Sequence, residues 1–187
     1  MKQFRLTLLS LLLTFAACTV GVDHGDGPVA TPADFAPLAN TELSGTLGYL
    51  DYTSERWERI PVSMRFDDVQ GRKIRFHVRY PGETQYNETD TLKLSKDGRA
   101  LSGDVIIERR ATGNETVVVT QSRGEDDGRA ADIRTTYAIS DGTLTITKNV
   151  RFDGESDYFR RNAYELRRDQ RKVWRAVGDA PASGSAG

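Results

Sequence analysis

Alternation of apolar and polar residues is the feature of this chain that most restricts its fold. Over residues 73–80, Ile, Phe, Val and Tyr side chains take turns with Lys, Arg and His side chains. The same period of two runs through residues 59–66 and 132–139. This period is typical of β-strands with one face on a core and the other in water. Between residues 42 and 165 we find no segment with a convincing helical period, so the sequence predicts an all-β domain.

Turn signals separate these stretches at regular intervals. Asp-Gly pairs occur at residues 97–98, 127–128, 141–142 and 153–154. Such a pair between two alternating runs indicates a hairpin, because Gly readily takes the positive φ of a tight turn. Strands joined by short turns pair with their sequence neighbours, so we expect an antiparallel up-and-down meander of eight or nine strands. The predicted strands are 43–52, 57–67, 72–80, 88–95, 99–110, 115–123, 130–139, 143–151 and 157–167.

A meander of this length has two outer edges, and closure into a barrel removes them. In strand count, meander order and chain length the architecture resembles the lipocalin-like, or calycin, barrels. The resemblance implies an interior that is either filled by side chains or holds one small apolar ligand.

The alternation also predicts which side chains point into the barrel. We expect Val105, Ile107, Val117 and Val119 to do so. Inward tyrosines need partners for their hydroxyl groups, which indicates a polar spot or a pocket mouth. The candidate ligand-binding residues are Tyr49, Met64, Phe66, Phe76, Tyr80, Tyr137 and Tyr164.

The first 18 residues have the layout of a secretory signal. Lys2 and Arg5 precede a short, mostly apolar run, which ends in Phe15-Ala16-Ala17-Cys18. These last residues resemble the lipobox of bacterial lipoproteins. The resemblance implies that residues 1–17 are removed as a signal peptide and that Cys18 is acylated, for example with palmitate. Thr19, rather than Asp, after the cysteine implies lipid anchoring in the outer membrane, facing the periplasm. The alternative is an ordinary signal peptide that leaves a free thiol at the single cysteine.

Two segments flank the predicted barrel domain of residues 42–177. Residues 18–41 are rich in Gly, Pro and Ala and are predicted to be a flexible linker. Residues 178–187 have a similar composition and are predicted to be a disordered tail. Within 165–177, Leu166, Val173 and Val177 share one side of a predicted short helix. This helix would cover a barrel mouth or an edge, or would lie as a basic foot on a membrane.

The charged residues suggest one basic side. The formal net charge is −1, yet cations gather on the outward positions of two early strands and near the end of the chain. If the barrel closes, the first and last strands become neighbours, and these cations could merge into one surface that attracts an anionic partner. The alternative is an ordinary surface with cross-strand ion pairs. The candidate basic face is Arg65, Lys73, Arg75, Arg79, Arg161 and Arg168.

Catalytic and metal-binding patterns are weak. The two histidines, His24 and His77, are too few for a zinc cluster, and no Gly-x-Ser-x-Gly elbow occurs. We therefore predict no enzyme activity, no catalytic or metal-binding residue, no cofactor and no nucleic-acid partner. The predicted function is that of an envelope lipoprotein that binds a small apolar or amphipathic ligand in its barrel. The alternative is a non-catalytic structural or assembly lipoprotein that contacts an anionic envelope component through the basic face.

Overall fold

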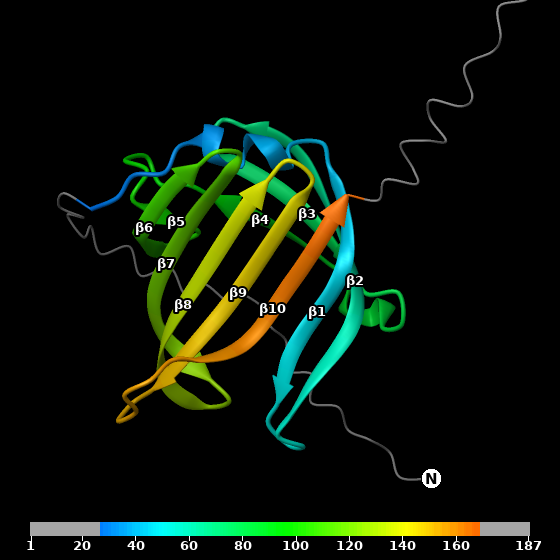
Figure 1. Cartoon of the computed structure of the whole chain (residues 1–187), viewed down its shortest axis with the longest axis vertical. Coiled ribbons are helices and arrows are strands. Elements are labelled where there is room, and N and C mark those ends of the chain that lie inside the picture. The colour runs from blue at the N-terminus through cyan, green and yellow to red at the C-terminus, as the bar shows by residue number, and fades with distance from the viewer. Residues whose placement is uncertain (1–26, 169–187) are drawn as a thin grey trace, which may run out of the picture.

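The computed structural model describes residues 27–168. Within this range ten antiparallel strands form one sheet in the order β4-β3-β2-β1-β10-β9-β8-β7-β6-β5. Every strand pairs with its sequence neighbour except β4 with β5, and the first strand pairs with the last, as expected for a closing meander (Figure 1). The strands are β1 (Glu42–Asp51), β2 (Arg56–Gln70), β3 (Lys73–Arg79), β4 (Glu88–Lys93), β5 (Ala100–Leu101), β6 (Asp104–Thr112), β7 (Glu115–Asp126), β8 (Arg129–Ser140), β9 (Thr143–Phe152) and β10 (Phe159–Arg168).

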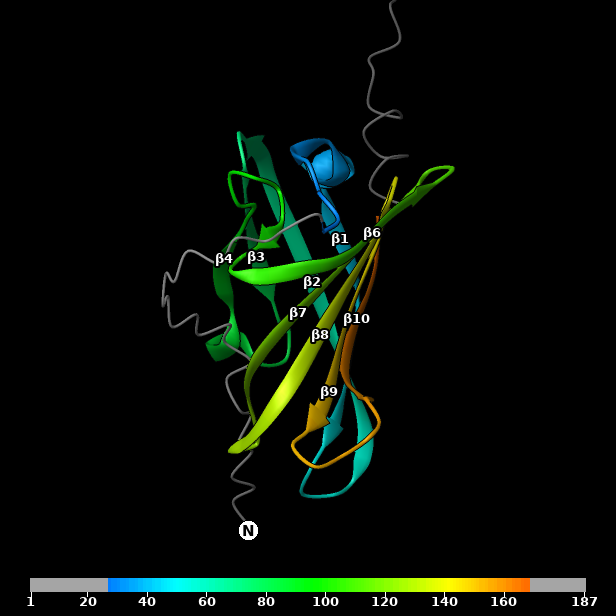
Figure 2. The same ribbon diagram turned by 90° about the vertical axis from the view of Figure 1, so that its left-hand side faces the viewer.

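The barrel is nearly closed. Its two remaining edges, β4 and β5, meet at a single bridge between Leu94 and Leu101. Beyond that bridge β4 pairs only with β3, and β7 from Ser122 to Asp126 pairs only with β8. The seam between these edges lies between β4 on one side and β6 and β7 on the other (Figure 2).

The prediction of an all-β, lipocalin-like antiparallel meander is confirmed, with one difference in the number of strands. The predicted strand 99–110 is broken by a turn at Ser102 and Gly103, which both have positive φ. This turn separates β5 from β6 and brings the count to ten.

The break also changes which side chains face the core. Val105 and Ile107 are 38% and 40% exposed, whereas Ile106 between them is 2% exposed. The pairing of β6 with β7 also shifts register by one residue immediately after Ile106, between Ile106 and Glu108. In β7 it is Val118, rather than Val117 or Val119, that joins the main core cluster. The inward placement of these four predicted residues is therefore wrong. In β6 the turn and the register shift invert the pattern of period two, and in β7 Val118 pairs with the inward Tyr137, so Val117 faces outward although it is only 4% exposed.

A 3₁₀ helix, η1 (Pro32–Leu38), covers one end of the barrel (Figure 1). Phe35 and Leu38 are each 1% exposed and belong to the main core. Asp34 fixes the helix start by accepting a hydrogen bond from the Thr31 backbone N–H at 2.7 Å. The sequence predicts this segment as part of a linker over 18–41, because its Pro and Ala content masks its two apolar anchors. The core of the domain begins before β1.

Asp34 also ties η1 to the barrel wall. Its carboxylate accepts a hydrogen bond from Arg109 Nη2 of β6 at 2.5 Å. Burial raises the pKa of Asp34, but the hydrogen bonds from Arg109 and Thr31 outweigh it and lower that pKa overall. We call this end of the barrel the η1 end.

The opposite end, which we call the hairpin end, carries the β1–β2 and β7–β8 turns (Figure 1). A second apolar cluster fills it, centred on Ala131, Val150 and Phe152. The Tyr52 ring from the β1–β2 turn lies 6.4 Å from the ring of Phe152. Both ends of the barrel are therefore packed by side chains.

Two further sequence predictions concern the C-terminus and the membrane. Residues 165–168 belong to β10, and the rest of the predicted C-terminal helix lies outside the described residues. Among residues 27–168, no helix has the length and apolarity to cross a bilayer.

Candidate ligand-binding layer in the barrel

All seven predicted ligand-binding residues lie on the inside of the barrel. Six are buried in the main core cluster, and the seventh, Tyr49, is partly buried against it. Met64, Phe66 and Phe76 share this cluster with Phe35 of η1, and the Phe66 and Phe76 rings stack at 5.7 Å. The apolar members therefore serve as packing at the η1 end.

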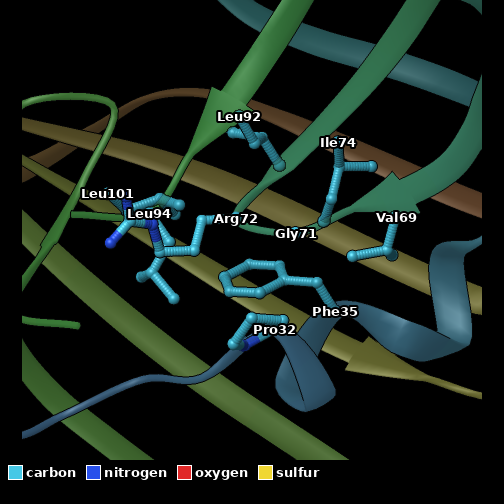
Figure 3. A pocket seen from close by; sticks show the side chains of 9 residues that line it. All are labelled: Pro32, Phe35, Val69, Gly71, Arg72, Ile74, Leu92, Leu94 and Leu101. Carbon is cyan, nitrogen blue, oxygen red and sulfur yellow. The ribbon is translucent and has the colours of Figure 1, made fainter. Parts of the chain in front are cut away.

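A small apolar hollow remains beside η1 (Figure 3). Its volume of about 10 Å³ corresponds to about one water molecule. The η1 end of the interior is therefore filled by side chains. The hollow is lined by Pro32, Phe35, Val69, Gly71, Arg72, Ile74, Leu92, Leu94 and Leu101.

Inward polar side chains replace the apolar core toward the hairpin end. In β10 the inward positions run from Leu166 through Tyr164 to Asn162, so the lining changes from aliphatic to amide within four residues. The same change occurs in β1 between Leu47 and Tyr49, the latter opposite Asn162. We define the polar layer as Tyr49, Tyr80, Glu88, Asp104, Asn162 and Tyr164.

A buried pair of tyrosine hydroxyls forms the centre of the polar layer. Tyr80 Oη and Tyr164 Oη lie 2.9 Å apart, and both residues are 7% exposed. Burial raises the pKa of both phenols, and the charge of Glu88 raises them further. Tyr80 is held in place because its backbone N–H donates to Asn87 Oδ1 at 2.8 Å, beside the short helix η2 (Thr84–Tyr86). Both hydroxyls are thus neutral at physiological pH and can donate as well as accept hydrogen bonds.

Asn162 carries an unsatisfied donor group. It is 2% exposed, and its Nδ2 has no hydrogen-bond partner among the described residues. Its cross-strand neighbours are Tyr49 of β1 and Lys148 of β9. A buried amide without a partner costs about 1–3 kcal/mol, so a native structure usually supplies a water molecule or a ligand to such a group. The Asn162 amide is therefore the strongest sign of a binding position in the barrel.

Carboxyl groups line the side of the polar layer next to the seam. Burial raises the pKa of Glu88 on β4, and the nearby charge of Asp90 raises it further. Burial likewise raises the pKa of Asp104 at the start of β6. A hydrogen bond that its carboxyl group accepts from Ser122 lowers this pKa, but burial outweighs it. The pKa of Tyr137 is also raised. Burial is the main cause, and the charges of Asp104 and Asp90 add to it. The layer thus offers both hydrogen-bond donors and strong acceptors to the polar part of a ligand.

An ionic cluster closes the barrel below the polar layer. The Asp126 carboxylate accepts hydrogen bonds from Tyr52 Oη at 2.5 Å, Lys148 Nζ at 2.7 Å and Arg161 Nε at 3.1 Å. Arg161 also donates to the backbone carbonyl of Leu50, and its guanidinium lies over the Tyr52 ring at 4.3 Å. These contacts join the turn after β1 to β7 across the end of the barrel, although β1 and β7 are four positions apart in the strand order of the sheet. We call Tyr52, Asp126, Lys148 and Arg161 the ionic cluster.

The predicted basic face needs two corrections. Arg161 is 7% exposed inside the ionic cluster, because a register shift between Arg160 and Asn162 turns it inward. Arg168 forms a salt bridge with Asp141 at 3.1 Å, and β10 is separated from β3 by β1 and β2. The first and last strands are neighbours as expected, but the two groups of cations do not merge.

The remaining cations do share one surface. Arg65, Lys73, Arg75 and Arg79 are exposed on the outer side of β2 and β3. Sequence reasoning missed Lys93 of β4, which lies directly opposite Lys73. The alternation of Thr89, Thr91 and Lys93 with Glu88, Asp90 and Leu92 would have placed it there.

His77 of β3, one of the two histidines of the sequence, lies on this outer side. Its Nδ1 contacts Thr89 Oγ1 at 2.9 Å and its Nε2 contacts Asp67 at 3.4 Å. In the part of the chain that the structure covers, no three His, Cys, Asp or Glu residues are grouped as metal ligands. The polar layer is therefore the arrangement that remains to be explained.

No model of a protein family matches this sequence, and no curated protein matches it. Among solved structures, the chain is similar to Rv2717c from Mycobacterium tuberculosis, with a TM-score of 0.51 and 14% identity. That match covers 76% of this chain and 100% of the other. The chain forms a lipocalin-like β-barrel. At this identity the likeness is one of fold alone.

A mutant of the fluorescent protein UnaG is a second similar structure. Its TM-score is 0.37 and its identity is 14%, over 72% of this chain and 97% of the other. What the barrel binds must therefore be argued from its own lining.

Proposed function

We propose that this protein is a lipid-anchored protein of the cell envelope that binds a small amphipathic molecule in the polar layer of its barrel. The unpartnered amide of Asn162, beside the Tyr80–Tyr164 hydroxyl pair, is the observation that carries the proposal. The ligand would present an acceptor group to Asn162 and an apolar part to the core above it. Because the η1 end is filled, the ligand is small.

The proposed role is binding without catalysis. The inward groups of the layer are phenols with raised pKa, carboxyl groups with raised pKa and an amide. These groups suit recognition of a neutral polar head or an amine. Within the polar layer no nucleophile with an adjacent base supports a reaction step.

Anchoring rests on the sequence of residues 15–18, outside the described range. Acylation at Cys18 would remove the reactive thiol and keep the barrel beside the outer membrane, in the periplasm. Intact mass measurement of the protein extracted from membranes tests this directly. We expect the added mass of acyl chains, which the Cys18→Ser variant lacks; an unmodified thiol in the wild type would refute anchoring.

Ligand binding is tested by native mass spectrometry of the barrel after incubation with a total envelope extract. We expect a bound small molecule in the wild type and about tenfold less in Asn162→Ala, since one buried hydrogen bond is worth about 1–3 kcal/mol. Asn149→Ala is the matched control, because Asn149 lies on β9 at an outward position of the alternation. A wild type that retains no molecule, or equal binding by both variants, would refute the proposal.

A second candidate function is contact with an anionic envelope component through the outer side of β2–β4. The direct pairing of Lys73 with Lys93 favours it, because like charges opposite one another in a sheet are destabilising. Such a pair is more easily explained if a partner supplies the missing negative charge.

A further inference from the structure

One outer side of the barrel carries cations without matching anions. We define the basic face as Arg65, Lys73, Arg75, Arg79 and Lys93, all exposed on adjacent strands β2, β3 and β4. Lys73 and Lys93 are directly paired, and Arg75 lies two positions along β3, opposite Thr91. Within residues 27–168, Lys73, Arg75, Arg79 and Lys93 form no salt bridge. Asp67 lies 3.9 Å from Arg65 and 3.4 Å from His77, and Glu42 of β1 lies directly opposite Arg65, so the acids at this face gather at its Arg65 edge.

Several cations elsewhere on the outside of the barrel, on β7–β9 in particular, are paired with acids. Asp132 on β8 lies 3.1 Å from Arg123 and 2.5 Å from Arg151. Arg129 lies 3.0 Å from Glu155 across the hairpin end. The chain has nearly equal numbers of acids and bases, so the excess of positive charge on β2–β4 is a local property of this face. An ordinary surface of cross-strand ion pairs describes β7–β9 but not the basic face.

The chain enters the barrel beside this face. The Ala30 backbone N–H donates to the Gly98 carbonyl at 2.9 Å, in the turn that directly follows β4 and Lys93. Arg99 in the same turn donates to the Gly27 carbonyl. Gly27 is nine residues after Cys18, and nine residues span at most about 30 Å when extended. A lipid on Cys18 would therefore hold the membrane within about 30 Å of the β4 end.

From these two observations we infer that the basic face lies against anionic lipid headgroups of the leaflet in which Cys18 is anchored. The inference rests on the proposed anchoring for its geometry and on the unpaired cations for its chemistry. The lipid tether would confine the barrel near the membrane surface. Cations that attract the leaflet only weakly in free solution would then be sufficient to orient the barrel on it. Anionic lipid headgroups would also supply the negative charge that the Lys73–Lys93 pair lacks.

The test uses the chain from Thr19 onward, which keeps every described residue and carries no acyl group. Sedimentation is measured with vesicles of phosphatidylcholine alone and with vesicles in which about a third of the lipid is phosphatidylglycerol. We expect binding only to the anionic vesicles, weakened by salt. Reversal of three charges, in Lys73→Glu, Arg75→Glu and Arg79→Glu combined, should weaken it about 100-fold or more, because each surface cation contributes roughly a factor of five.

The control reverses three exposed cations elsewhere, with Arg56→Glu, Arg110→Glu and Arg167→Glu combined. It has the same net charge as the test variant and should bind within about threefold of the wild type. If the test variant does not fold, as judged by circular dichroism, Gln at the same three positions replaces Glu, with an expected loss of about 100-fold. Equal binding to both kinds of vesicle, no detectable binding to the anionic vesicles at low salt, or an equal loss in the control, would overturn the inference. Because no acyl chain and no barrel ligand are present, this experiment tests the cations of the basic face alone, and the proposed anchoring and ligand binding are tested separately by the mass measurements.

Discussion

Asp126 offers the sharpest test of how this barrel is held together. Its side chain is 1% exposed and is hydrogen-bonded to Tyr52, Lys148 and Arg161. Replacement by Asn keeps the shape but removes the only negative charge in the ionic cluster. Arg161, with a side chain 8% exposed, would then remain a buried cation without a counterion, whereas Lys148 at 19% could turn toward water.

The expected cost follows from that burial. Breaking a buried ion pair by removing one partner costs about 3–5 kcal/mol, and the exposure of Lys148 favours the lower end of that range. We therefore expect Asp126→Asn to lower the free energy of unfolding by about 3 kcal/mol. For a domain of this size the midpoint of thermal unfolding would fall by about 10 °C.

Urea unfolding followed by circular dichroism measures this change. Arg161→Met should cost far less in the Asp126→Asn background than alone, because the two side chains form one unit. Asp132→Asn is a control, because Asp132 also forms salt bridges with two arginines but lies at the surface. We expect this variant to lose much less stability than Asp126→Asn. A loss below about 1 kcal/mol for Asp126→Asn would refute the claim that the ionic cluster closes the hairpin end.

The pH dependence gives an independent check. Burial raises the pKa of Asp126, but Lys148 and Tyr52 outweigh it and hold that pKa below its usual value. A lowered folded-state pKa stabilises the protein above the unfolded-state pKa of about 3.9, and the contribution is lost as the pH falls through the folded-state pKa. The difference in stability between wild type and Asp126→Asn should therefore be constant near neutral pH and should shrink below about pH 4. A difference that disappears well above that pH would contradict the assignment.

Three further predictions follow from the packing. Phe35→Ala, which empties the 1%-exposed anchor of η1, should cost about 3–5 kcal/mol by urea unfolding, whereas Val29→Ala at 42% exposure should change stability by less than about 0.5 kcal/mol. Gly45→Ala would place a Cβ 1.9 Å from the Glu165 carbonyl oxygen and so disturb the β1–β10 pairing, which should lower the free energy of unfolding by about 3 kcal/mol. A Cβ at Gly82 would contact nothing, so Gly82→Ala should leave stability unchanged. Equal thermal midpoints for the two variants would contradict this. Because burial raises the pKa of Tyr80, Tyr137 and Tyr164, these phenols should stay neutral while the protein is folded, and stability should fall as the pH rises above about 10, measured by ultraviolet difference titration against urea-unfolded protein.

Much of the fold could be predicted because local rules determine it. The predicted strand 143–151 corresponds to β9, and 130–139 lies within β8, since both runs alternate cleanly and are bounded by Asp-Gly turns. Prediction was wrong where one extra residue changes the face of a strand, as at Ile106 and at Arg161. A bulge depends on the partner strand, so a single alternating run contains no signal for it.

The candidate site was predicted in part for the same reason. Alternation was enough to place Tyr49, Tyr80, Tyr137 and Tyr164 inside the barrel. It gave no sign that Tyr80 and Tyr164, 84 residues apart, would share a hydrogen bond. Nor did it show that the Asn162 amide would lack a partner, because hydrogen-bond satisfaction is a property of the assembled interior.

By itself, the sequence determined most of the strands, their antiparallel order and the need to close the meander, because side-chain periodicity and turn residues act over a few positions. Only the tertiary structure decided that η1 fills one end, that an ionic cluster closes the other and that a polar layer lies between them. It also separated the basic face from β10 and added Lys93 to it. These features bring together residues far apart in the chain, and their energies depend on burial and on partners that exist only after folding.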